Sequence, residues 1–276
     1  MRLFERTNCV TTGSDQVARR YEFAIDLGRR AGDLGMTFFR SAETLKVESK
    51  GHQDLVSNGD REVELFVRAA ISEAFPQDGI VGEEHAPKEG RSGFVWVIDP
   101  IDGTANFVRG IPAWCVAIAC VHDKRTVVGV IHEPSANECF SARRGGGAFL
   151  NGRPITVSKS TSLADGSVGT GFSNRREARR IVPVIEALLA EGGVFFRNAS
   201  GALMLAYVAA GRLIGYCEEH MNAWDCLAGL LMVEEAGGRI LPPDGSTMVE
   251  QGTMVLAAAP GVYDRLAEIT AKGFSR

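Results

Sequence analysis

Residues 94–104, Phe-Val-Trp-Val-Ile-Asp-Pro-Ile-Asp-Gly-Thr, decide the fold, because a strongly apolar run ends there abruptly in acidic residues. The aromatic and β-branched residues at 94–98 predict a buried strand. Proline has no N–H to donate to a strand ladder, so we expect the strand to end at Pro100. Asp99 and Asp102 follow three positions apart. We expect both carboxylates to project from the strand end into one small volume.

The residues after the second aspartate favour an anion-binding turn. Gly103 permits close approach of a backbone, and Thr104 is a good N-cap for a short helical turn over residues 105–108. Free N–H groups at a helix start favour a phosphate. The segment therefore offers hard oxygen ligands and a phosphate cradle side by side.

Other acidic residues also lie where an expected element begins or ends. A short apolar strand over 79–81 is followed by Glu83, and Asp225 lies at the start of a helix expected over 224–236. Asp54 precedes the second expected helix of the chain. The acidic residues are therefore concentrated at the ends of elements.

Bringing four of these carboxylates together is costly without cations, because like charges repel at close range. Mg²⁺ removes that cost, since it prefers oxygen ligands and keeps waters and substrate phosphate in its shell. Two such ions can activate a water and stabilise a leaving alkoxide. The four residues are Glu83, Asp99, Asp102 and Asp225.

Each of these residues also has an ordinary structural interpretation. Asp99 suits a strand-end turn, Asp102 the start of an Asp-Gly turn, and Asp225 the N-cap of its helix. A Glu83-Glu84 pair is most often solvated. These interpretations leave unexplained why three separate strand or helix ends all finish in acids, so the joint pattern favours a metal site.

The order of the expected elements predicts an α/β protein. Helices followed by short strands make up the first half, whereas helices and strands alternate in the second half, which indicates α/β layering. No repeat or Pro/Ser-rich linker divides the chain. We expect one domain over residues 1–276, with two halves at about 1–158 and 159–276 that share the active site. The expected helices are 16–42, 58–75, 176–190, 202–210 and 224–236, and the expected strands are 79–81, 94–98, 114–122, 126–132, 138–142, 167–170, 194–197, 213–217 and 254–258.

The composition excludes several classes of protein. The chain has 276 residues, 45% apolar and 23% charged, with a formal net charge of −4. These are ordinary proportions for a soluble globular protein, and they lack the basic surplus that nucleic-acid binding usually shows. Apolar runs such as 114–121 are far shorter than the roughly 20 residues of a membrane span, and the N-terminus shows no secretory signal. The six cysteines form no CxxC pair and are interpreted as thiols, which fits a cytoplasmic protein.

The chain resembles the inositol monophosphatase family of Mg²⁺-dependent sugar and cyclitol phosphatases over nearly its whole length. The resemblance implies a sugar-phosphatase fold, an αβαβα layered sandwich, usually assembled as a homodimer. It also implies two or three Mg²⁺ ions in each active site and inhibition by lithium. The matching motifs are 99–104 with Asn106-Phe107, Trp224-Asp225 with Ala228-Gly229 and 235–238, Gly82-Glu83-Glu84, and Asp54-Leu55-Val56.

The resemblance implies a ligand set for two of the metals. Glu83, Asp99 and the carbonyl of Ile101 are expected to hold the first metal. Asp99 is expected to bridge to a second metal, which Asp102 and Asp225 also hold.

The resemblance also implies catalytic roles. Glu83 and Thr104 are expected to orient the metal-bound water for in-line attack, and Asp54 is expected to assist this network. The backbone of Gly103 and Thr104 is expected to bind the phosphate.

The substrate side of the site departs from the family pattern at one place. The family commonly has Gly-Ser/Thr-Ala lining the pocket, and Ser200, Gly201 and Ala202 stand in its place. Glu218 lies where inositol-selective members carry a glutamate that contacts substrate hydroxyls. Asp225 is expected to serve both metal and substrate.

The implied activity is hydrolysis of inositol monophosphate or a similar polyol phosphate. Histidinol-phosphate phosphatase and fructose-1,6-bisphosphatase are alternatives, because they share the metal site. Glu218 favours a polyol over histidinol phosphate, since a carboxylate can accept two hydroxyl hydrogen bonds, but it can equally pair with the ammonium group of histidinol. A regulatory RNA- or transcription-associated role is an alternative of another class, supported only by the arginines at 175, 176, 179 and 180. Such a run is more often a solvated helix face, so we expect a small-molecule phosphomonoester as the partner and no membrane or nucleic acid.

Overall fold

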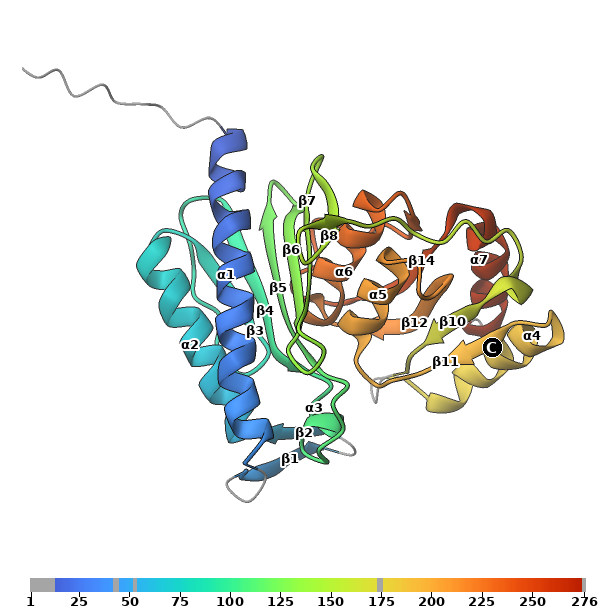
Figure 1. The fold of residues 1–276 in the computed structure, drawn as a ribbon, viewed down its shortest axis with the longest axis horizontal. Coiled ribbons are helices and arrows are strands. Elements are labelled where there is room, and N and C mark those ends of the chain that lie inside the picture. The colour runs from blue at the N-terminus through green and yellow to red at the C-terminus, as the bar shows by residue number, and fades with distance from the viewer. Residues whose placement is uncertain (1–12, 42–44, 52–53, 173–175, 275–276) are drawn as a thin grey trace, which may run out of the picture.

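The computed structural model describes residues 13–41, 45–51, 54–172 and 176–274. Their elements stack in layers: two helices, a seven-stranded sheet, two helices, a five-stranded sheet and two helices (Figure 1). This order confirms the predicted αβαβα sandwich. Within the described residues, no helix is long and apolar enough to cross a bilayer.

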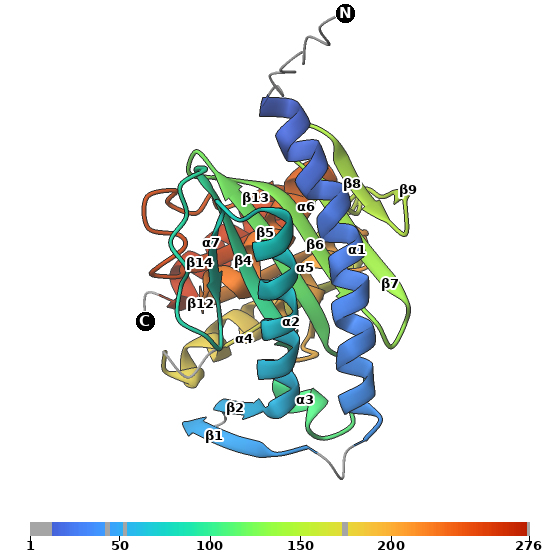
Figure 2. The same cartoon turned by 90° about the vertical axis from the view of Figure 1, so that its left-hand side faces the viewer.

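The first helical layer covers the outer face of the seven-stranded sheet. Helices α1 (Gly13–Phe39) and α2 (Asn58–Ala74) lie side by side across this face (Figure 2), and α2 ends before Pro76 as predicted. The N-cap of α2 is Ser57, which with Asp60 forms a capping box that satisfies the first backbone N–H groups. A hairpin of β1 (Val47–Gly51) and β2 (Asp54–Ser57) joins the two helices.

The seven-stranded sheet has its strands in sequence order, with β3 parallel to β4 and every later pair antiparallel. Tight turns that contain Gly145 and Gly152, both with a positive φ, join its last three strands. The strands are β3 (Gly79–Gly82), β4 (Phe94–Asp102), β5 (Cys115–His122), β6 (Arg125–Glu133), β7 (Glu138–Arg143), β8 (Gly147–Leu150) and β9 (Arg153–Pro154).

The prediction that β4 ends at Pro100 is wrong. The strand continues to Asp102, because Asp99 pairs with Ala117 and Asp102 then pairs with Cys115, with a register shift between them. The proline lies within this irregularity, where its missing N–H breaks no regular ladder bond. Because of this shift, both aspartates lie in the last part of β4, where it still pairs with β5.

The middle layer consists of α5 (Gly201–Ala209) and α6 (Ala223–Glu235), which lie between the two sheets (Figure 1). Both helices are buried on nearly every side, as expected for a layer that packs against a sheet on either face. A Cβ on Gly129 of β6 would lie 2.7 Å from the carbonyl oxygen of Ala228, so glycine lets α6 approach the first sheet closely.

The second sheet has the order β11-β10-β12-β14-β13, and its outer face is covered by α4 (Val182–Ala190) and α7 (Pro260–Phe274). The helix expected over 176–190 is shorter, because a 3₁₀ turn at Ala178–Ile181 precedes α4 and Pro183 fits only its first turn. The strand expected at 213–217 begins later, at Gly215. The strands are β10 (Ser167–Thr170), β11 (Val194–Phe196), β12 (Gly215–Met221), β13 (Arg239–Ile240) and β14 (Thr253–Ala258).

Candidate active site

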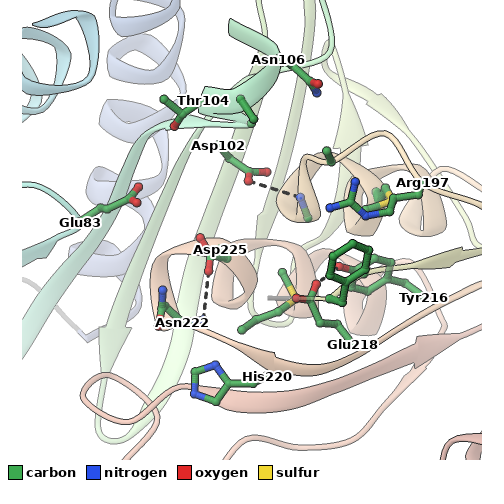
Figure 3. A pocket seen from close by; sticks show the side chains of 18 of the residues that line it. Glu83, Asp102, Thr104, Asn106, Arg197, Tyr216, Glu218, His220, Asn222 and Asp225 are labelled. Carbon is green, nitrogen blue, oxygen red and sulfur yellow. Dashed lines mark hydrogen bonds between the residues drawn. The ribbon is translucent and has the colours of Figure 1, made fainter. Parts of the chain in front are cut away.

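A cleft of about 640 Å³ opens where the C-terminal end of β4 meets the N-terminal ends of α5 and α6 (Figure 3). Glu83, Asp102 and Thr104 line it from the first sheet, whereas Glu218 lines it from the second and Asp225 from the middle layer. Both halves of the chain therefore contribute to one cleft.

The predicted acidic cluster borders the cleft, with Asp102 and Asp225 in its lining and Asp99 buried beside them. Asp99, Asp102 and Asp225 each offer a carboxylate oxygen, and these oxygens lie within 4.8 Å of one another. Burial raises the pKa of Asp99 well above its usual range, and the charges of Glu83, Asp102 and Asp225 raise it further. Two buried carboxylates and the half-buried carboxylate of Asp225 form an all-oxygen donor set, which fits a hard divalent cation such as Mg²⁺. The carbonyl of Ile101 lies beside this cluster, 3.0 Å from Oγ1 of Thr104.

Asp102 is anchored at the start of α5. Its carboxylate accepts the hydroxyl of Ser200 at 2.6 Å, the N–H of Ala202 at 2.8 Å and the N–H of Gly201 at 3.3 Å. Burial raises the pKa of Asp102, and these hydrogen bonds oppose the rise. The N-terminal N–H groups of a helix lack partners within the helix, so a carboxylate is stabilised there.

The same contacts change the role expected of residues 200–202. Ser200 and Ala202 are fully buried and hold Asp102, so they form no floor of the pocket. Gly201 alone of the three lines the cleft. Residues 200 and 202 therefore contact the acidic cluster through Asp102.

Thr104 is not the N-cap that the sequence predicts. The short helix α3 (Thr104–Phe107) has Gly103 as its N-cap, with a φ of 97° that favours glycine. A Cβ at Gly103 would lie 2.9 Å from the carbonyl oxygen of Ala113, which confirms the predicted close approach. The hydroxyl of Thr104 instead turns toward α2, where it lies 3.0 Å from Oδ1 of Asp60.

Asp60 lies directly behind the cleft residue Thr104, and the sequence analysis did not single it out. It is fully buried, and its second oxygen accepts both the N–H of Ser57 at 2.8 Å and the hydroxyl of Ser57 at 2.6 Å. The signal for it was a serine followed three residues later by an acid, the pattern of a capping box. Asp54, the residue expected in this role, begins β2, and its side chain lies outside the described part of the structure.

Asp225 belongs to the first turn of α6, where Asn222 is the N-cap. Its Oδ2 accepts the N–H of Asn222 at 3.0 Å (Figure 3), which fixes the carboxylate beside Asp99 and Asp102. The interpretation of Asp225 as the N-cap is therefore wrong, because Asn222 holds that position. Asp225 is the third residue of the helix, where its carboxylate completes the capping box and also belongs to the acidic cluster.

The second sheet supplies the opposite wall of the cleft. Glu218 on β12 accepts the hydroxyl of Tyr216 at 2.6 Å, and burial raises the pKa of Glu218 to about 7. A Cβ at Gly171 would lie 2.0 Å from Oε2 of Glu218, so this glycine makes room for the pair. Arg197, which the sequence analysis did not single out, lines the same wall and packs 4.4 Å from the ring centroid of Phe172.

The cysteines agree with the prediction of thiols where the structure describes them. Cys120 and Cys139 are free and buried, as are Cys217 and Cys226. Cys115 is also free, and its Sγ lies 3.7 Å from Oδ2 of Asp102. Cys9 lies outside the described residues.

The chain belongs to the inositol monophosphatase family, whose model matches residues 16–273. It is 39% identical to an inositol-1-monophosphatase of Mesorhizobium japonicum, over 84% of this chain and 88% of that protein. It is also 38% identical to the Nus factor SuhB of Escherichia coli, over 78% of this chain and 82% of that protein.

Solved structures share the fold. The extragenic suppressor protein suhB from Bartonella henselae superposes with a TM-score of 0.87 at 33% identity, covering 92% of this chain and 99% of that chain. An IMPase of Thermotoga maritima superposes with a TM-score of 0.83 at 30% identity, covering 93% of this chain and 98% of that chain. The resemblance expected from the motifs is therefore confirmed at the level of family and fold.

Proposed function

We propose that the chain is a Mg²⁺-dependent phosphomonoesterase that hydrolyses inositol monophosphate, or a similar polyol phosphate, to the free alcohol and phosphate. The observation that carries this proposal is the cluster of Asp99, Asp102 and Asp225 that borders the cleft, with Glu83 beside it. The family membership of the chain supports the same reaction.

Five groups would hold the metal ions. Glu83, Asp99 and the carbonyl of Ile101 would form one position, and Asp99 would share a second with Asp102 and Asp225. Bound Mg²⁺ supplies Lewis acidity toward the phosphate and lowers the pKa of a water. The chain contributes the fixed positions of the ligands, since α5 anchors Asp102 and α6 anchors Asp225.

Residues on the first-sheet side of the cleft would orient the attacking water. Glu83 and Oγ1 of Thr104 would accept hydrogen bonds from this water, and Asp60 orients the hydroxyl of Thr104 by accepting from it at 3.0 Å. Asp54 remains a proposed member of this network. The backbone N–H groups of Gly103 and Thr104 would bind the phosphate.

The second-sheet side would recognise the rest of the substrate. Glu218 and Asp225 would accept hydrogen bonds from hydroxyl groups, and Tyr216 keeps one oxygen of Glu218 occupied so that the other remains for the substrate. Arg197 would add a positive charge to this wall. These contacts suit a polyol, and they leave histidinol phosphate and fructose 1,6-bisphosphate as alternative substrates.

A panel of phosphomonoesters tests the proposal. We expect Mg²⁺-dependent phosphate release from inositol 1-phosphate, no release in EDTA, and inhibition by lithium. Fast release from histidinol phosphate together with none from inositol 1-phosphate would replace the proposed substrate. Equal release with and without Mg²⁺ would exclude the proposed mechanism.

A role in transcription is the second candidate, because several relatives carry the name Nus factor SuhB at 35–39% identity. In the described part of the arginine run, Arg180 lies 2.6 Å and Arg176 3.8 Å from the carboxylate of Glu219, which reduces the positive field that this run offers. A salt-dependent RNA mobility shift that disappears in an Arg176→Ala/Arg180→Ala variant would support this role.

We further propose that residues 1–276 form one catalytic domain and that the protein is a cytoplasmic homodimer. The support for the dimer is the edge strand β11, on which Val194, Phe195 and Phe196 are 55%, 43% and 37% exposed. An apolar edge strand of this kind favours association with a second copy. Light scattering should give about twice 29.7 kDa for the wild type and one copy for Phe195→Asp.

A further inference from the structure

Helix α2 presents two buried carboxylates on one face, at positions i and i+4. Asp60 and Glu64 are both 0% exposed. Asp60 contacts Thr104, as described above. Glu64 lies one turn further along and contacts a different segment, the turn that follows β3.

The carboxylate of Glu64 holds the two backbone amides that come directly after Glu83. Its Oε2 accepts the N–H of Glu84 at 2.7 Å, and its Oε1 accepts the N–H of His85 at 3.2 Å. The residue before Glu83 packs on the same group, because a Cβ at Gly82 would lie 2.2 Å from Oε1 of Glu64. The backbone on both sides of Glu83 is therefore in contact with one buried carboxylate.

Two side-chain nitrogens, from Arg68 and His85, complete the surroundings of Glu64. Nε of Arg68 lies 3.6 Å and Nδ1 of His85 lies 3.4 Å from Oε1 of Glu64. Arg68 also donates to the carbonyl of Ala86, so the same turn is held from two side chains of α2. Replacing a buried ion pair by apolar side chains is often neutral or stabilising, which makes a carboxylate at this position weak evidence for a role in stability alone.

We propose that Glu64 is a positioning residue that fixes the Gly82–His85 turn and thereby the carboxylate of Glu83 at the cleft. Glu83 projects from this turn toward the cleft that holds Asp225 (Figure 3), and its charge acts on Asp99. The first two turns of α2 thus support both groups assigned to the water, Thr104 through Asp60 and Glu83 through Glu64. This inference rests on the proposed function.

The test is Glu64→Gln, with Glu62→Gln as the matched control on the exposed side of the same helix. An amide cannot accept both backbone N–H groups, so the turn should loosen. Hydrogen–deuterium exchange of the metal-free protein should be faster in peptides covering 82–86 and unchanged in β4. Calorimetric titration with Mg²⁺ should show an affinity about tenfold lower, the size expected for losing a partner of a metal ligand. Activity at saturating Mg²⁺ should fall less than the affinity does.

Several results would overturn the inference. One is a rate of hydrogen–deuterium exchange at residues 82–86 of Glu64→Gln that equals that of the wild type. Another is faster exchange there while the Mg²⁺ affinity stays unchanged. If Glu64→Gln fails to fold, Gly82→Ala tests the same contact, because its methyl group displaces the carboxylate, and unchanged Mg²⁺ affinity there would count against the inference. Failure of the proposed function is distinguishable, because it appears as a wild type that binds Mg²⁺ but hydrolyses no phosphomonoester.

Discussion

Two buried aspartates near opposite ends of β4 have opposite surroundings, which shift their pKa values in opposite directions. Asp78 and Asp99 are each 1% exposed. Asp78 accepts Nε and Nη2 of Arg20 at 2.8 and 2.7 Å, the hydroxyl of Ser92 at 2.7 Å and Nε1 of Trp96 at 2.9 Å. Burial raises the pKa of Asp78, but these hydrogen bonds outweigh it and the pKa is lowered.

Asp99 has neighbours of the opposite kind. The charges that act on it belong to Glu83, Asp102 and Asp225, and its pKa is raised by burial and by these carboxylates. A buried charge with its full set of donors holds elements together, whereas a buried charge among like charges costs stability until a cation arrives. Such perturbed groups in a cleft are typical of functional sites.

The largest expected effect is at the cleft end of the strand. Asp99→Asn keeps the shape of the side chain but removes the charge proposed to bridge two metals, so kcat toward inositol 1-phosphate should fall about a thousandfold, or several kcal/mol. Circular dichroism should show an intact fold. Near-normal Mg²⁺-dependent turnover in this variant would contradict the two-metal assignment. Asp26→Asn, on the exposed surface, is the control.

A substitution of Asp78, near the opposite end of the strand, should lower the stability of the protein and leave its activity largely unchanged. Asp78→Ala leaves Arg20 buried without its partner, and breaking a buried pair in this way costs about 3–5 kcal/mol in the free energy of unfolding. Urea denaturation measures the loss. Asp26→Ala removes the exposed pair with Arg30 and should cost less than about 0.5 kcal/mol. Equal losses in the two variants would remove the distinction between the buried and the exposed pair.

Glu218 extends the comparison to the second wall of the cleft. Its folded-state pKa is about 7 against an ordinary value of 4.5, so the folded state binds more protons than the unfolded state does. The resulting stability is present below the ordinary value and is lost as the pH rises through about 7. In EDTA, the wild type should lose about 3 kcal/mol relative to Glu218→Gln between roughly pH 5 and pH 8. A difference that stays constant across this range would show that Glu218 ionises normally.

The smallest expected effect concerns the backbone beside the cleft. Ala199 has a φ of 63° just before the N-cap of α5, a conformation that costs an alanine roughly 1–2 kcal/mol. Asn137 adopts a similar φ of 54° in a surface turn, where asparagine is tolerated. Ala199→Gly should therefore raise the free energy of unfolding by up to about 1 kcal/mol after the added chain entropy is subtracted. Asn137→Gly should change the free energy of unfolding little. A larger gain in Asn137→Gly than in Ala199→Gly would show that the backbone strain lies in the surface turn and not beside the cleft.

The sequence predicted the parts of the site that depend on local chemistry. An apolar run that ends in two aspartates placed Asp99 and Asp102 together, and a helix start placed Asp225, because these arrangements follow from strand and helix geometry over a few residues. The order of the elements predicted α/β layering, whereas the αβαβα arrangement of the layers was implied by the family resemblance. Most strand and helix bounds agree within a few residues for the same reason.

Contacts between distant segments could not be predicted in this way. Thr104 reaches Asp60 across 44 positions, and Asp102 reaches Ala202 across 100. In the sequence, Glu64 cannot be distinguished from any other acidic residue of an amphipathic helix. No nearby residue indicates that it will accept hydrogen bonds from the N–H groups of Glu84 and His85. The continuation of β4 past Pro100 likewise depends on how β5 pairs with it.

The split of the cleft between two sheets has a consequence for redesign. Glu218 and Tyr216 belong to β12, and Arg197 follows β11, so the wall proposed to recognise the substrate belongs to a different scaffold from the strand that carries Asp99. Libraries confined to these positions would vary the leaving alcohol while the hydrolytic machinery stays intact. The proposed metal site and the proposed substrate wall meet at Asp225, so we expect selectivity to change mainly through β12 and Arg197.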